Sequence, residues 1–155
     1  MKFIEKSVYF FATGCYTGRI PFAPGTFGTL FGLIPCFFFS KIILPAAILL
    51  SVIFIFISIF IAGSAEKILK QKDPGCIVID EVAGIIVTFL GIQFNFLSVV
   101  AGFVIFRILD IWKPFPIGSV EKKLSGGTGI VLDDVVAGII GNFCLRIFLI
   151  YSGKL

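Results

Sequence analysis

The sequence predicts an all-α protein, a compact multihelical bundle embedded in a membrane, with about six helices and four to five membrane-embedded segments. Hydrophobic residues make up 58% of the chain and charged residues 14%, the mean hydropathy is +1.11, and the apolar residues are gathered into long runs. A soluble domain is nearer half apolar and a quarter charged. The 155 residues suffice for one domain, which we expect to span 1–155.

Four apolar runs define the expected helices, at residues 28–40, 42–62, 82–109 and 135–151. The run 42–62 would be about 31 Å long as a helix, enough to cross one bilayer core. Only Lys41 separates it from the first run, which predicts a helical hairpin over 28–62 with Lys41 at its far end. Gln93 and Asn95 interrupt the third run, so two short helices that turn near 91–95 are favoured over one long tilted helix.

The remaining segments set the orientation of the bundle. Pairing the runs as hairpins leaves the polar segments 1–27, 63–81 and 110–134 on one face, and the first of them predicts an amphipathic helix at the membrane interface. These segments hold nine basic residues: Lys2, Lys6, Arg19, Lys67, Lys70, Lys72, Lys113, Lys122 and Lys123. The positive-inside rule then places this face in the cytoplasm. The net charge of +4 fits anionic lipid headgroups better than nucleic acid.

Two residue types narrow the chemistry. The chain has no histidine, which removes the commonest general base and the commonest transition-metal ligand. Its four cysteines show no CxxC spacing and lie among apolar residues, so they are expected to be buried small hydrophobes.

Five of the nine acidic residues lie at the ends of apolar segments: Asp80, Glu81, Asp110, Asp133 and Asp134. Arg107 and Lys113 flank Asp110 at three residues on either side, which puts Arg107 and Asp110 on one helix stripe and Lys113 near the helix end. On the expected topology these charges converge with a net charge of about −3, which is costly in a partly dry site. A divalent cation would relieve that cost, and an all-oxygen set of ligands suits Mg²⁺ or Mn²⁺.

A metal beside Arg and Lys indicates phosphate chemistry. Two glycine segments could contribute. The turn PFAPGTFGTL (21–30) enters a helix with Thr26 as a candidate N-cap, and SGGTGI (125–130) is expected to be a flexible loop before Asp133. Structural alternatives stay open, because Asp80, Asp133 and Asp134 could be N-caps and Arg107–Asp110 a simple ion pair. The small-residue steps Ala83–Gly84 and Ala137–Gly138 are expected to be helix-packing contacts.

Four stretches occur in a specific order: FAPGTFGTL (22–30), DPGCIVIDEVAG (73–84), GFVIFRILDIWKPFPI (102–117) and SGGTGIVLDDVVAG (125–138). Together they closely resemble the phosphatidylglycerophosphatase A family over roughly residues 20–142. The resemblance implies a multi-pass, Mg²⁺-dependent lipid phosphatase of the bacterial inner membrane. It would convert phosphatidylglycerophosphate to phosphatidylglycerol, the step before cardiolipin. The motif residues carried over are Asp80, Glu81, Arg107, Asp110, Lys113, Asp133 and Asp134, with Gly25 and Thr26 in the turn. Thr29 stands where many members have Ser.

The resulting hypothesis is a phosphomonoesterase acting on a membrane lipid at the cytoplasmic face. The five carboxylates would bind Mg²⁺ and one of them would activate water, while Arg107, Lys113, Gly25 and Thr26 would bind the phosphate. Three points stay open at this stage: which carboxylate is the base, whether one or two metals bind, and whether water attacks the phosphate directly or an aspartyl-phosphate intermediate forms first. No protein partner is implied. The alternatives are a cation carrier or channel with an intramembrane carboxylate site, and a non-catalytic membrane subunit.

Overall fold

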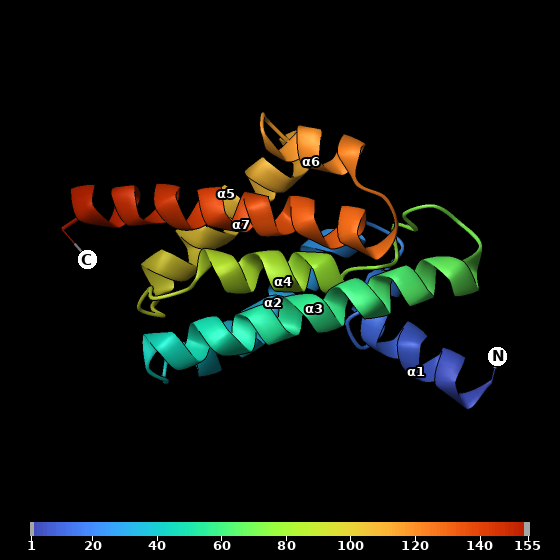
Figure 1. The fold of residues 1–155 in the computed structure, drawn as a ribbon. Coiled ribbons are helices and arrows are strands. Elements are labelled where there is room, and N and C mark those ends of the chain that lie inside the picture. The colour runs from blue at the N-terminus through green and yellow to red at the C-terminus, as the bar shows by residue number, and fades with distance from the viewer. Residues whose placement is uncertain (1, 154–155) are drawn as a thin grey trace.

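A computed structural model describes residues 2–153 of the chain. Within them lie seven α-helices, one short 3₁₀ helix and no strand (Figure 1). The elements are α1 (Phe3–Ala12), η1 (Thr17–Arg19), α2 (Pro24–Phe39), α3 (Leu44–Leu69), α4 (Ile79–Thr88), α5 (Phe96–Trp112), α6 (Ile117–Lys123) and α7 (Gly126–Tyr151). The all-α class is confirmed. The expected number of about six helices is too low, because the polar segment 110–134 contains the additional short helix α6.

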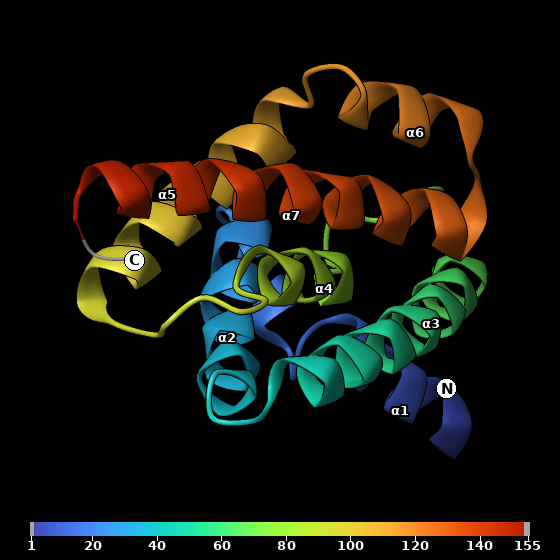
Figure 2. The ribbon, with the colours of Figure 1, turned by 60° about the vertical axis from the view of Figure 1, so that its left-hand side comes forward.

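Helix α4 forms the centre of the bundle. It packs against α2, α3, α5 and α7, and Figure 2 shows it nearly end-on among them. Apart from Asp80 and Glu81, every residue of this helix is buried. A helix that is apolar on all sides is expected to be enclosed by other helices, which explains why this short segment occupies the core.

The crossing of α4 and α7 is close because both helices present glycine there. A Cβ atom on Gly138 would lie 2.4 Å from the carbonyl oxygen of Gly84, and one on Gly84 would lie 2.7 Å from the carbonyl oxygen of Asp134. The two small-residue steps are therefore helix-packing contacts, as predicted. They bring Asp134 of α7 alongside α4, which is what assembles the candidate site.

The run 82–109 does form two helices, with the turn where Gln93 and Asn95 predicted it. Asn95 caps α5 by accepting a hydrogen bond from the Ser98 backbone N–H at 3.0 Å. At the end of α4, Asn142 and Arg146 of α7 donate to the carbonyl oxygen of Leu90, each at 2.9 Å. These bonds satisfy carbonyls that a helix end leaves open, which matters where lipid replaces water.

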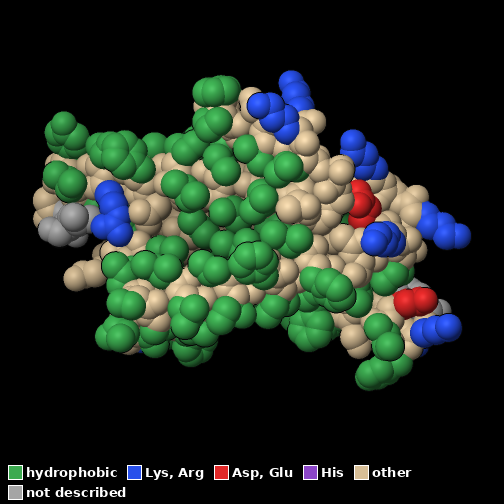
Figure 3. Space-filling view, viewed as in Figure 1, with side chains coloured by type: hydrophobic (Ala, Val, Ile, Leu, Met, Phe, Trp, Pro, Cys, Tyr) green, Lys and Arg blue, Asp and Glu red, His purple; other side chains and the backbone are tan. Residues whose placement is uncertain are grey.

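Two helices, α3 and α7, are long and apolar enough to cross a membrane, whereas α2 is apolar but shorter. The predicted hairpin over 28–62 is present as α2 and α3, joined through Lys41. Large hydrophobic side chains cover most of the face in Figure 3, and most Lys and Arg side chains gather toward the end where α1 lies. These features are typical of a membrane-associated protein. The four to five embedded segments, and the placement of α1 at the interface, stay predictions.

Two local expectations are wrong. The segment 125–130 is not a flexible loop, because α7 begins at Gly126 and a Cβ on Gly127 would lie 1.9 Å from the carbonyl oxygen of Ile59. Glycine is needed there for the close approach of α7 to α3. The cysteines are all free, as their spacing implied, but only Cys36 is buried and Cys15 is exposed.

Candidate metal and phosphate site

Three carboxylates meet where α4 begins. Asp80 and Glu81 lie in the first turn of α4, and Asp134 lies on α7 beside it. One oxygen from each of the three lies within 4.8 Å of the others. The partial positive charge of the helix N-terminus favours the two acidic residues in the first turn of α4. Three carboxylates at this separation nevertheless repel one another.

The site contains polar atoms that are buried without a hydrogen-bond partner. Among the described residues these are Asp80 Oδ1, Glu81 Oε2, Arg107 Nε, Asp133 Oδ1 and Asp134 Oδ2. A buried carboxylate oxygen without a partner is costly, and three of the four belong to the cluster of Asp80, Glu81 and Asp134. An oxygen-binding cation fits this donor set, because it would satisfy all three at once.

Burial changes the acidity of the two carboxyls on α4. It raises the pKa of Asp80 well above its usual value, and the neighbouring Glu81 raises it further. It raises the pKa of Glu81 to about 8, with Asp134 and Asp110 adding to the rise and with the neighbouring Asp80 and Arg107 opposing it. Without a cation, these groups therefore hold protons at a pH where an exposed carboxyl would be ionised.

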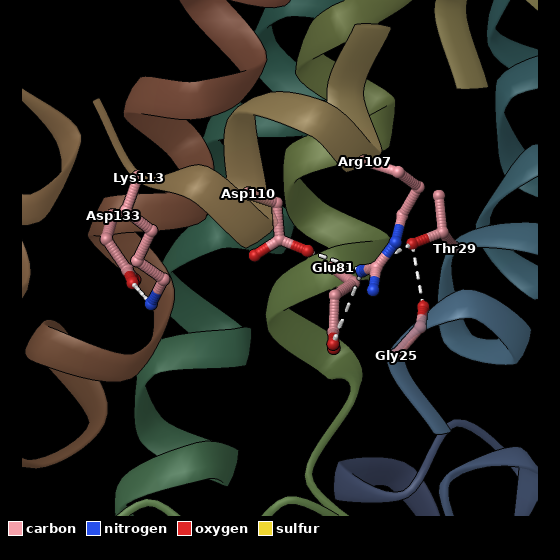
Figure 4. A network of polar contacts seen from close by, with 7 residues as sticks. All are labelled: Gly25, Thr29, Glu81, Arg107, Asp110, Lys113 and Asp133. Carbon is pink, nitrogen blue, oxygen red and sulfur yellow. Dashed lines mark hydrogen bonds and ion pairs between the residues drawn. The ribbon is translucent and has the colours of Figure 1, made fainter. Parts of the chain in front are cut away.

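Arg107 of α5 lies between Glu81 of the cluster and helix α2 (Figure 4). Its Nη1 atom pairs with Asp110 one turn further along α5, lies 3.9 Å from Glu81 Oε1, and donates to the Thr29 hydroxyl at 3.4 Å. The Thr29 hydroxyl in turn donates to the carbonyl oxygen of Gly25 at 2.8 Å. The predicted Arg107–Asp110 pair is present, and it holds a guanidinium whose Nε still lacks a partner.

Lys113 and Asp133 form a separate pair, on the other side of Asp110 in Figure 4. Lys113 Nζ lies 2.6 Å from Asp133 Oδ2 and 3.2 Å from Glu121 Oε1. Burial opposes the charge on this lysine, but the two carboxylates raise the pKa of Lys113 above its usual value. In this structure Lys113 serves to hold α6 and α7 together at the end of α5.

The five predicted acidic residues thus fall into two groups. Asp80, Glu81 and Asp134 form the cluster, with Asp110 near enough to act on Asp134 electrostatically, while Asp133 turns toward Lys113. None of them is an N-cap: α4 is preceded by Val78 and α7 by Ser125. Thr26 is not an N-cap either, because Ala23 holds that position in α2. Glu121 and the Thr29 hydroxyl are contacts that the sequence did not predict.

Gly25 provides a specific test of this arrangement. A Cβ atom there would lie 2.1 Å from Glu81 Oε1 and 3.1 Å from Arg107 Nη1. We expect Gly25→Ala to push the Glu81 carboxylate out of the cluster and to weaken Mg²⁺ affinity about tenfold, which corresponds to about 1.4 kcal/mol, with little loss of thermal stability. Isothermal titration with Mg²⁺ would measure this.

Gly75→Ala is the matched control, because nothing lies within 4 Å of its added Cβ. An affinity of Gly25→Ala equal to that of Gly75→Ala would show that Glu81 does not need its present position to bind the ion.

The acidity of Glu81 predicts how the metal-free protein responds to pH. Its pKa of about 8 when folded exceeds that of the unfolded chain, so the folded state binds the extra proton between those values. Stability is therefore greatest below the unfolded pKa and falls as pH rises through about 8. In EDTA we expect the Tm to fall between about pH 5 and pH 9, and added Mg²⁺ to restore it most at high pH.

Glu81→Gln should reduce this pH dependence, because glutamine resembles the protonated acid, and the raised pKa of Asp80 should account for the part that remains. Glu66→Gln should leave it unchanged, since Glu66 lies outside the cluster. A Tm that rises with pH in EDTA would contradict the buried protonated state.

Comparison with known proteins gives a consistent result. The family model described as phosphatidylglycerophosphatase A matches residues 10–149. Phosphatidylglycerophosphatase A of Escherichia coli (strain K12) is 40% identical over 132 residues, covering 83% of this chain and 76% of that protein. The enzyme of the same name from Haemophilus influenzae is 31% identical over 134 residues, covering 85% of this chain and 82% of that protein.

A protein named putative phosphatidylinositol-3-phosphatase, from Bacteroides thetaiotaomicron, is 36% identical over 139 residues, covering 82% of this chain and 84% of that protein. No solved structure matches the chain.

Proposed function

Because this chain belongs to the phosphatidylglycerophosphatase A family, we propose that it is a Mg²⁺-dependent lipid phosphatase. It hydrolyses phosphatidylglycerophosphate to phosphatidylglycerol and inorganic phosphate. Water adds to the terminal phosphorus, the bond to the glycerol oxygen breaks, and that oxygen leaves as the alcohol. The proposal includes a place in phosphatidylglycerol and cardiolipin synthesis, at the cytoplasmic face of the bacterial inner membrane.

One observation carries the assignment of the site. Asp80, Glu81 and Asp134 each have a buried oxygen without a partner, and one oxygen from each of the three lies within 4.8 Å of the others. Arg107, whose Nε is also buried without a partner, lies beside Glu81. The three carboxylates would hold Mg²⁺, which when bound would neutralise phosphoryl oxygens and acidify a coordinated water. The combination of clustered carboxylate oxygens and a free guanidinium N–H is what a phosphate monoester needs.

The residues of the chain then have distinct roles. Asp110 orients Arg107 so that its free N–H groups can bind a phosphoryl oxygen, and Gly25 leaves room for both Arg107 and Glu81. Lys113 holds Asp133 at the edge of the site, and its direct contact with the phosphate stays a prediction. Asp110 and Asp133 remain further candidates for the metal and for the base that takes the proton from water.

A specific alternative exists for one part of this proposal, the headgroup of the lipid substrate. The Bacteroides relative bears the name of a phosphatidylinositol-3-phosphatase, and the same chemistry would cleave either phosphomonoester. The test is phosphate release by the detergent-purified protein from phosphatidylglycerophosphate and from phosphatidylinositol 3-phosphate, each with Mg²⁺ and with EDTA. Faster Mg²⁺-dependent release from the first supports the proposal, and faster release from the second reassigns the headgroup. If folded protein releases phosphate from neither lipid, the phosphatase proposal is overturned. Cation flux in proteoliposomes would then be the next measurement.

A further inference from the structure

Thr29 of α2 is a fully buried polar residue beside the site, and the proposed chemistry gives it no role. Its hydroxyl has one proton, which it donates to the carbonyl oxygen of Gly25 at 2.8 Å. The same oxygen accepts a hydrogen bond from Arg107 Nη1 at 3.4 Å, as Figure 4 shows. Thr29 therefore connects the first turns of α2 to the guanidinium of α5.

The bond to Gly25 alone would be ordinary for a threonine in a helix, because a threonine hydroxyl often donates to the carbonyl four residues earlier. Thr88 of α4 is also fully buried, and it donates to the carbonyl oxygen of Gly84 at 3.0 Å in the same way. The contact with a charged side chain from another helix is what distinguishes Thr29. Hydrogen bonds from a charged donor are stronger than those between neutral groups, so this contact can orient the guanidinium.

Arg107 has two anchors that act in different ways. Asp110 lies on the same helix, so the ion pair fixes the guanidinium only relative to α5. The bond to Thr29 ties it to α2, a helix that makes few direct contacts with α5. Both anchors use Nη1, whereas the buried Nε has no partner. In a planar guanidinium the N–H of Nε and one N–H of Nη2 point to the same side, so this edge is left for two oxygens of one phosphoryl group.

We propose that Thr29 is a positioning residue for phosphate binding, an inference that rests on the proposed function. Its hydroxyl holds the Arg107 guanidinium in the plane in which the edge formed by Nε and Nη2 binds the phosphoryl group. Thr29 does not itself bind the phosphate, because its one proton is donated to Gly25. Without this anchor the guanidinium can turn about its pairing with Asp110, and a bidentate contact requires both donors in one orientation.

Thr29→Val tests this role, because valine keeps the branched shape and removes the hydroxyl. We expect kcat/KM for phosphatidylglycerophosphate to fall about tenfold and the inhibition constant of inorganic phosphate to rise about tenfold, while Mg²⁺ affinity changes less than about threefold. Thr29→Ser keeps the hydroxyl and should restore both values to within about twofold of the wild type. Thr88→Val is the matched control: it removes the same kind of bond from a buried threonine at the far end of α4, and it should change both values less than about twofold.

A second measurement does not depend on turnover. The chain has only three arginines, so the nitrogen NMR signals of their guanidinium groups can be assigned, and loss of a signal in Arg107→Lys identifies that of Arg107. A guanidinium held in one orientation gives separate signals for its two Nη atoms, whereas one that rotates gives a single averaged signal. We expect separate signals for Arg107 in the wild type and in Thr88→Val, and an averaged signal in Thr29→Val. Thr29→Ala removes the hydroxyl without adding bulk and should give the same result if valine disturbs the fold.

The outcomes separate the two proposals. A Thr29→Val variant that is as active as Thr88→Val, or a Thr29→Ser variant that is as impaired as Thr29→Val, would overturn the role of Thr29 and leave the phosphatase intact. Unchanged Arg107 signals in Thr29→Val would overturn it as well. A wild-type protein that releases no phosphate would overturn the proposed function, and the Arg107 signals would still decide whether the Thr29 hydroxyl holds the guanidinium.

Discussion

Asp134→Asn should reduce kcat/KM for phosphatidylglycerophosphate by at least about 1000-fold, a loss of about 4 kcal/mol of transition-state stabilisation. Asp134 is 3% exposed, and one of its oxygens belongs to the cluster with Asp80 and Glu81. Asparagine keeps the shape of the side chain but removes the negative charge that a cation needs. The same variant should bind Mn²⁺ at least about 100-fold more weakly, as measured by electron paramagnetic resonance.

Asp73→Asn is the matched control for this substitution. Asp73 is an exposed acid in the left-handed conformation, with φ of 45°, which asparagine also adopts readily. It should retain activity and Mn²⁺ affinity within about twofold, the range expected for a surface change. Asp134→Asn could instead fold, keep its activity and bind Mn²⁺ as this control does. That result would show that the cluster has a structural role, and it would support the alternative of a non-catalytic membrane subunit.

The helices were predictable where polar residues interrupt apolar runs. Gln93 and Asn95 marked the turn between α4 and α5, and Lys41 marked the turn between α2 and α3. The start of α7 was not predictable, because its glycines are usually turn residues. Glycine is accepted in that helix since it lets α7 approach α3 at Gly127, and this long-range contact leaves no local signal.

The site was predictable in its residue types but not in its grouping. The stretches IVIDEVAG (77–84) and IVLDDVVAG (130–138) look alike, yet both acids of the first join the cluster and only Asp134 of the second does. Adjacent residues on a helix point about 100° apart. Inside α7, therefore, Asp134 faces α4 while Asp133 faces Lys113 at the end of α5, and the packing of α4 and α5 on α7 determines which acid has which partner.

Arg107→Lys should lower kcat/KM about 100-fold, the usual cost of losing one donor to a developing phosphoryl charge, while Mg²⁺ affinity changes less than about threefold. The guanidinium contacts Asp110 and Thr29 through Nη1 and keeps a buried Nε without a partner. A lysine ammonium can pair with Asp110 but cannot also present that second donor in a fixed plane. The readouts are steady-state kinetics and the inhibition constant of inorganic phosphate, which should rise.

Arg146→Lys is the control that separates binding of phosphate from support of the fold. Arg146 lies at the other end of α4, where it donates to Leu90 and to Asn142 at 2.9 Å each. Losing one of these bonds should lower the Tm while kcat/KM stays within about threefold, because no site residue moves. Arg107→Lys should give the opposite pattern, with activity lost and Tm nearly kept. If instead it lowered Tm and Mg²⁺ affinity in proportion to activity, Arg107 would serve to hold α5 against α2 and α4, and the phosphate would need another cationic ligand.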